Sequence, residues 1–212
     1  MRLNRAYWIS SFLVAATILV GLWGWVTLPE GAGVPLHHLG FDGQMHGEPS
    51  RAVIWAIPFA AFVVLATMRL VARRGVGEAV EAYEATIIGV AGVLLVAEAV
   101  LVARAQNPGF DVMRPVAVAV GVLLLALGNV LGKARHNAVF GVRTPWTLAD
   151  PRVWDKTHRF AGRGLVLGGV ALIAIALVLK QEAALGIAIA VCTAGPLLTA
   201  VGWSRRLSRR RH

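Results

Sequence analysis

Residues 115–131 read PVAVAVGVLLLALGNVL and carry no charged side chain. An apolar block of this length approaches the ~20 residues that a helix needs to cross the hydrocarbon core of a bilayer. The backbone must be helical there, because lipid offers no partner for a free peptide group. The block therefore predicts a transmembrane helix with Asn129 near one end, where an amide can hydrogen bond between helices.

Five further apolar blocks of similar length occur along the 212-residue chain. The sequence therefore predicts an all-α membrane protein, a bundle of six transmembrane helices over residues 8–28, 52–71, 85–103, 115–131, 164–179 and 183–203. The composition agrees, because 15% of the residues are charged, against about 25% in soluble domains. The first block is longer than the apolar region of a signal peptide, and no cleavage site follows it. We therefore expect it to be a membrane span and not a signal peptide that is removed.

Basic residues give the net charge of +10 and lie between and beyond the apolar blocks. This placement is typical of loops that face anionic lipid, not of direct nucleic-acid binding. With a cytoplasmic N-terminus, 17 of the 21 Lys and Arg residues lie inside, and the outer side receives Arg51, Arg104, Arg114 and Lys180. This bias predicts a multi-pass protein of the bacterial plasma membrane with both termini cytoplasmic.

Two connections are long enough to carry function, an outer loop over 29–51 and an inner loop over 132–163. We expect an N-terminal three-span region (1–114), a second three-span region (115–204) and a basic tail (205–212) that anchors to anionic lipid. The single cysteine, Cys192, excludes an internal disulfide, and we expect it to pack as a small apolar side chain.

The inner loop combines turn-forming residues with a helix start. Gly141 allows a tight turn, and Pro145 pushes Thr144 toward an extended conformation. Pro151 suits a first helical position. We therefore expect a short helix over 151–162, separate from the fifth span.

Helical spacing places four side chains near one face of that short helix: Trp154, Thr157, His158 and Ala161. Trp146 and Trp154 suit the lipid headgroup level, so we expect the loop to fold back against the membrane surface. Two roles stay open, a rigid staple between the fourth and fifth spans and a partner-binding surface. For binding we favour Arg143, whose guanidinium can grip a carboxylate or phosphate with two hydrogen bonds.

The same stretch resembles the signature of the SdpI family of bacterial membrane proteins. The resemblance extends over residues 128–159 and rests on residue types at fixed spacing: Gly128-Asn129, Asn137, Gly141-Val142-Arg143-Thr144-Pro145-Trp146-Thr147-Leu148, Trp154 and Thr157-His158-Arg159. The outer loop is similar to a small domain of unknown function that often precedes this signature, through Pro35-Leu36-His37-His38, Gly43 and Gly47. It departs from that domain at His38, where an aromatic is expected, and at His46, where an acid is expected.

The resemblance implies an immunity protein against a secreted peptide toxin, bound at the outer face or within the bilayer. In the founding member it also implies capture of a transcriptional repressor at the membrane. The inner-loop candidates for partner binding are then Asn129, Asn137, Gly141, Arg143, Thr144, Pro145, Trp146, Thr147, Trp154, Thr157 and His158. The candidates for toxin contact are Pro35, His37, His38, Gly43 and Glu98.

Four potential metal ligands lie close together in the outer loop: His37, His38, Asp42 and His46. Imidazole and carboxylate suit zinc or copper, but the spacing fits no standard motif and nearby glycines make the loop adaptable. We therefore expect a metal-free loop and no stoichiometric zinc in the purified protein.

Glu98 lies inside the third predicted span, where a carboxylate costs several kcal/mol unless it is protonated, paired or facing water. We expect either a functional role or a structural one, in which the side chain reaches the outer interface or bonds Arg104 or Arg114. Two glycine pairs, Gly128 with Gly132 and Gly164 with Gly168, have the spacing of close helix contact and predict helix packing.

The sequence contains no hydrolase, metalloprotease or phosphate-binding motif. We therefore expect no enzyme activity and no cofactor. Besides immunity, two other functions stay open. A small-solute or proton-coupled transporter would need a polar path, for which Glu98 and Asn129 are the visible residues. A structural or sensor subunit would need another membrane protein as its partner.

Overall fold

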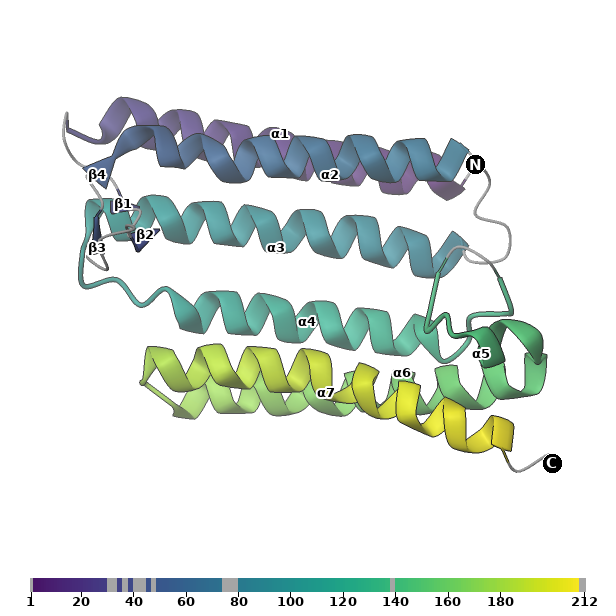
Figure 1. Cartoon of the computed structure of the whole chain (residues 1–212). Coiled ribbons are helices and arrows are strands. Elements are labelled where there is room, and N and C mark those ends of the chain that lie inside the picture. Colours follow the sequence, from purple (N-terminus) through teal and green to yellow (C-terminus); the bar gives the residue numbers. More distant parts are fainter. Residues whose placement is uncertain are drawn as a thin grey trace.

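A computed structural model describes residues 2–29, 34–35, 38–39, 45–46, 49–73, 80–137 and 140–209. Six long helices run side by side along one direction (Figure 1): α1 (Arg2–Thr27), α2 (Ala56–Arg73), α3 (Val80–Gln106), α4 (Met113–Leu131), α6 (Pro151–Val178) and α7 (Glu182–Arg209). Within the described ranges, six helices are long and apolar enough to span a membrane. The predicted six-helix membrane bundle is therefore confirmed.

The remaining elements are short and lie at the two ends of the bundle (Figure 1). At the end with both termini, the five-residue helix α5 (Pro145–Ala149) connects α4 to α6. At the opposite end, β1 (Val34–Pro35) pairs antiparallel with β4 (Pro49–Ser50), and β2 (His38–Leu39) with β3 (Met45–His46). A 3-10 turn, η1 (Arg51–Trp55), then leads into α2. Both termini lie at the same end of the bundle, as an even number of membrane crossings requires. Which side of the membrane this end faces stays a prediction.

The predicted break between a short helix over 151–162 and a fifth span from residue 164 is wrong. Helix α6 is continuous over 28 residues. It begins as expected, with Pro151 in the first turn and the Asp150 carboxylate accepting the Arg152 N–H at 2.8 Å. The glycine at 162 does not end the helix, because it lies against α4, where an added Cβ would be 2.7 Å from the Gly128 carbonyl oxygen.

Helices α4 and α6 touch through their backbones because glycines face each other at two levels. A Cβ on Gly169 would lie 2.7 Å from the Gly121 carbonyl oxygen, and a Cβ on Gly128 would lie 2.6 Å from the Gly162 carbonyl oxygen. Glycine at these levels is therefore required for the observed helix separation.

Both predicted glycine pairs lie in helix contacts, as expected. The Gly128 and Gly132 pair meets α6 at Gly162, whose added Cβ would lie 2.9 Å from the Gly132 nitrogen. Gly164 and Gly168 face α7 instead, and a Cβ on Gly168 would lie 2.7 Å from the Cys192 carbonyl oxygen.

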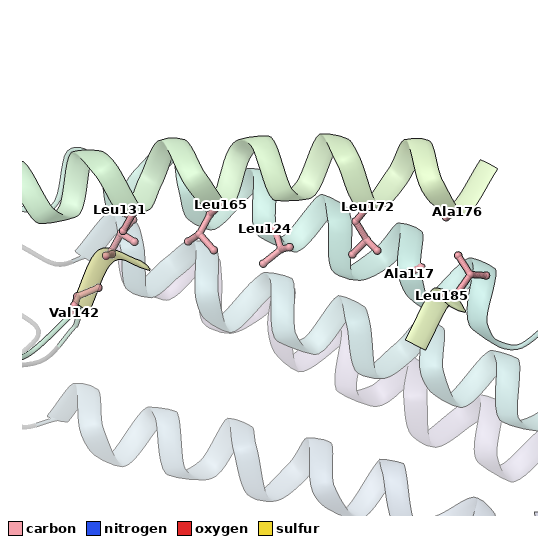
Figure 2. Packing of buried hydrophobic residues seen from close by; sticks show 10 residues of the cluster. Ala117, Leu124, Leu131, Val142, Leu165, Leu172, Ala176 and Leu185 are labelled. Carbon is pink, nitrogen blue, oxygen red and sulfur yellow. The ribbon is translucent and has the colours of Figure 1, made fainter. Parts of the chain in front are cut away.

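Apolar side chains of the described residues fill the space between the helices in three clusters, the smallest of which consists of Leu28, Ile54 and Val102. The largest cluster joins α4, α6 and α7, and Leu124, Leu165 and Leu172 lie between α4 and α6 (Figure 2). A second cluster joins α1, α2 and α3 around Leu65, Tyr83 and Ile87. Many other large apolar side chains face outward, as expected for helices solvated by lipid.

Candidate functional site

The connection between α4 and α6 folds into a junction around His158. This side chain is fully buried. Its Nε2 accepts the Val142 N–H at 3.0 Å, and its Nδ1 lies 2.9 Å from the Trp154 carbonyl oxygen. A ring nitrogen that accepts an amide N–H carries no proton, so these contacts assign a neutral imidazole that donates from Nδ1. His158 therefore ties the loop to the first turns of α6.

Gly141 makes the tight turn that the sequence predicts. Its φ is +124°, a conformation that residues with a side chain rarely adopt. An added Cβ would lie 2.1 Å from His158 Nε2. Glycine is thus needed for the backbone angle and for the approach of the loop to the imidazole.

Trp154 is not exposed to lipid, so the predicted contact of its ring with the lipid headgroups is wrong. The side chain is fully buried, and its Nε1 donates to the Ala134 carbonyl oxygen at 2.9 Å. Its ring stacks on His158 at 3.9 Å between centroids and contacts His136 edge-on at 5.0 Å. The loop covers this face of α6, so the predicted common face of Trp154, Thr157, His158 and Ala161 is confirmed as a buried one.

Helix α5 is held by a capping box between Thr144 and Thr147. The Thr144 N–H donates to the Thr147 hydroxyl at 2.8 Å, and the Thr147 N–H donates to the Thr144 hydroxyl at 3.3 Å. The Thr147 hydroxyl also lies 2.9 Å from the Val142 carbonyl oxygen. Pro145 occupies the first turn, where its missing N–H costs nothing.

Trp146 connects this small helix to α7. Its Nε1 donates to the buried Ser204 hydroxyl at 2.5 Å. The junction therefore connects α5, α6 and α7. These contacts support the structural role of the loop as a rigid connection between the fourth and fifth spans. Sequence reasoning missed Ser204 and also His136, whose Nε2 lies 3.0 Å from the Leu148 carbonyl oxygen. Neither residue carries a local signal, because each partner is distant in sequence.

Three polar candidates lie at the edge of the junction. Asn137 caps the turn, since its Oδ1 accepts the Phe140 N–H at 2.7 Å. Asn129 contacts Lys133 Nζ at 3.4 Å, so the predicted hydrogen bond to another helix is not found among the described residues. Arg143 is exposed and makes no hydrogen bond or ion pair with a described residue. Its guanidinium is therefore available to a partner.

Glu98 is fully buried where α1, α2 and α3 meet. A Cβ added to Gly21 would lie 2.9 Å from Glu98 Oε1 and 3.2 Å from the Pro58 ring. Neither carboxylate oxygen has a hydrogen-bond partner in the described part of the chain. A bilayer-buried carboxyl without a partner is costly.

The predicted arginine partners of Glu98 bind elsewhere. Arg104 donates to the Phe110 carbonyl oxygen at 2.7 Å and lies 3.9 Å from Glu182. Arg114 pairs with Asp111 at 3.4 Å. The pairing role proposed for Glu98 is therefore not the arrangement found.

The outer-loop candidates are described only in part. Pro35 pairs with Pro49 between β1 and β4, and His38 pairs with His46 between β2 and β3. His37 and Gly43 lie outside the described residues. Among the residues that are described, no group of three His, Cys, Asp or Glu side chains could hold a metal ion.

Comparison with known proteins identifies the C-terminal part of the chain. Residues 133–202, which include α5, α6 and most of α7, match the model of the SdpI/YfhL protein family. The Immunity protein SdpI of Bacillus subtilis (strain 168) is 43% identical over 54 residues, which cover 26% of this chain and 26% of that relative. No solved structure is significantly similar. Residues 133–202, about a third of the chain, are therefore similar to proteins of the SdpI/YfhL family.

Proposed function

We propose that this chain is an SdpI-like integral membrane protein that protects a bacterium against a secreted antibacterial peptide toxin. The observation that carries the proposal is the family match over residues 133–202, together with a relative named as an immunity protein. The matched residues contain the junction around His158, so the similarity extends over the candidate site. The match spans about a quarter of that relative, and the whole activity is therefore part of the proposal.

On the inner side, the proposed contact is Arg143, with a transcriptional repressor as the partner. The residues on either side of it are fixed, since the Val142 N–H donates to His158 and the Thr144 N–H donates to Thr147. A cation on so rigid a base loses little backbone entropy when it binds. Its planar fork suits a carboxylate of a protein partner.

On the outer side, the proposed toxin contacts are the loop over 29–51 and Glu98. The carboxyl of Glu98 is enclosed by three helices, so it meets a peptide only if that peptide enters between α1, α2 and α3. This assigns toxin contact to the region 1–114 and repressor contact to the region 115–204.

The test is a protection assay in a toxin-sensitive Gram-positive host that lacks its own immunity protein. Cells that express the chain are exposed to the SdpI-matched toxin, with membrane insertion verified for every variant. We expect survival with the native chain and loss of survival with Glu98→Gln. Death of cells with well-inserted native protein would contradict immunity to this toxin.

Arg143→Ala tests the inner contact in the same cells. We expect it to keep protection and to abolish recruitment of the repressor to the membrane. The matched control is Arg152→Ala, because Arg152 is also an exposed arginine near the start of α6. Equal recruitment by Arg143→Ala and Arg152→Ala would contradict the role of Arg143.

A second function, proton-coupled transport, has one observation in its favour, the buried carboxyl of Glu98. The buried polar side chains of α1, Ser10 and Thr17, donate to backbone carbonyls of their own helix and therefore do not extend a polar path from Glu98. Transport predicts a proton flux in liposomes that Glu98→Gln abolishes. If the protein confers immunity without transport, we expect no proton flux with the native chain or with Glu98→Gln.

A further inference from the structure

A groove between α4 and α6 gathers three cations beside the junction. Lys133, Arg159 and Arg163 line it together with the Asn129 amide. Its volume is about 580 Å³, and its apolar part is formed by Val166 and Leu167. None of the three cations was among the sequence-based candidates for binding.

The groove exists because glycines bring the two helices together. The end of α4 lies against α6, where an added Cβ on Gly132 would be 3.9 Å from the Arg159 Cα. Lys133 follows directly, so it enters the same groove as the arginines of α6. Arg159 and Arg163 are four residues apart and therefore share one helix face.

No ion pair with a described residue compensates the charge in this groove. Arg159 and Arg163 are exposed and form no hydrogen bond or ion pair with a described residue. Lys133 has a single long contact, 3.4 Å to the Asn129 oxygen. Like charges held together repel each other, and an anion in the groove would remove that repulsion.

The groove lies where the apolar parts of two spans end. Arg163 is the last charged residue of α6 before the apolar run to Val178, and Lys133 follows the apolar end of α4 at Leu131. Toward the bilayer, Leu167 is 70% exposed on the surface that faces lipid. Cationic and apolar surfaces are thus arranged in the order of a phospholipid headgroup and its acyl chain.

We propose that this groove binds the phosphate of an anionic phospholipid. Arg159 and Arg163 donate to the phosphate oxygens, for which a guanidinium fork is well suited. Lys133 adds a third charge, and the acyl chain lies along Leu167. None of the three cations is a residue proposed above for toxin or repressor contact, although Asn129, which also lines the groove, is an inner-loop candidate for partner binding.

Binding can be measured by native mass spectrometry on the delipidated protein, residues 1–212, in detergent. The probes are phosphatidylglycerol, phosphatidylcholine and inorganic phosphate at equal concentrations. We expect phosphatidylglycerol to bind at least ~10-fold more tightly than either other probe, because charge-assisted contacts and the acyl chain act together. Equal binding of phosphatidylcholine, or of inorganic phosphate, would overturn the proposal.

Variants then locate the site. Arg159→Gln/Arg163→Gln should weaken phosphatidylglycerol binding by ~10-fold or more. The matched control is Arg152→Gln/Lys156→Gln, which removes the same charge from exposed positions on α6 that do not line the groove. Equal loss in both pairs would show attraction by net charge alone and overturn the site. The selectivity of the native protein tests the proposal even if a variant fails to fold.

Discussion

Each half of the bundle buries one histidine or glutamate side chain among the described residues, and the two side chains differ in their hydrogen bonding. In α4–α7, both ring nitrogens of His158 have backbone partners at 2.9 and 3.0 Å. In α1–α3, both carboxylate oxygens of Glu98 lack a partner within the described chain. A satisfied buried group specifies one local structure, whereas an unsatisfied one costs stability.

This difference separates a structural role from a functional one. His158 explains the shape of the loop around it, because it fixes Val142 and requires glycine at 141. Glu98 also lies close to a glycine, since a Cβ on Gly21 would be 2.9 Å from its Oε1, but neither of its oxygens forms a hydrogen bond with a described residue. A buried polar side chain that lowers the stability of the protein and forms no hydrogen bond is a candidate for a functional role.

The largest effect is expected for Gly141→Ala. The new Cβ would meet His158 Nε2 at 2.1 Å, at a φ of +124°. Strain and the lost buried hydrogen bond should together cost about 3–5 kcal/mol of unfolding free energy. Denaturation in detergent measures this loss. Gly186→Ala on α7 is the control, because a Cβ there has no neighbour within 4 Å. Similar stability of both variants would contradict the close approach.

His158→Phe tests whether hydrogen bonds, and not volume, make the histidine necessary. The phenyl ring keeps the stack on Trp154 but leaves the Val142 N–H buried without a partner. We expect a loss of about 1–3 kcal/mol. His136→Phe, at an exposed position beside the same tryptophan, should cost less than about 1 kcal/mol. A reversed order would mean that His136 holds the junction.

Glu98→Leu should change stability in the opposite direction. Removing an unpartnered carboxyl from an apolar site should raise the unfolding free energy by about 1–2 kcal/mol. Glu182→Leu is the control, because that side chain is 45% exposed and should change stability by less than about 0.5 kcal/mol. Protection measured in parallel should be lost with Glu98→Leu. A destabilised Glu98→Leu protein would mean that the carboxyl does have a partner.

The sequence predicted the helices better than their ends. Apolar block length determines whether a segment spans a bilayer, so all six spans were recognised. The break before residue 164 was wrongly placed because glycines and arginines usually mark a helix end. Here Gly162 serves contact with α4, and Arg159 and Arg163 line a groove. Neither use is visible before the two helices are packed together.

The sequence indicates which residues form the junction but not whether their side chains are buried or exposed. The signature stretch contains Gly141, Thr147, Trp154 and His158, and the structure brings these four together. Trp154 was expected at the lipid surface because tryptophan often lies there. Its burial depends on the Ala134 carbonyl, 20 residues earlier, and periodicity within one helix cannot report such a partner.

The smallest effect is expected for two buried threonines in the junction, one whose hydroxyl lacks a hydrogen-bond partner and one whose hydroxyl has partners. The Thr157 hydroxyl is buried without a hydrogen-bond partner among the described residues, like the carboxyl of Glu98. Thr157→Val keeps the shape and removes an unsatisfied group, so it should stabilise the protein by about 0.5–1 kcal/mol. The matched change, Thr147→Val, removes a hydroxyl that accepts the Thr144 N–H and lies 2.9 Å from the Val142 carbonyl oxygen, and should destabilise it by about 1–2 kcal/mol. Thermal unfolding of the two variants should therefore shift in opposite directions. A loss of stability in both would mean that the Thr157 hydroxyl has a partner, such as a buried water, and that it does not resemble the carboxyl of Glu98.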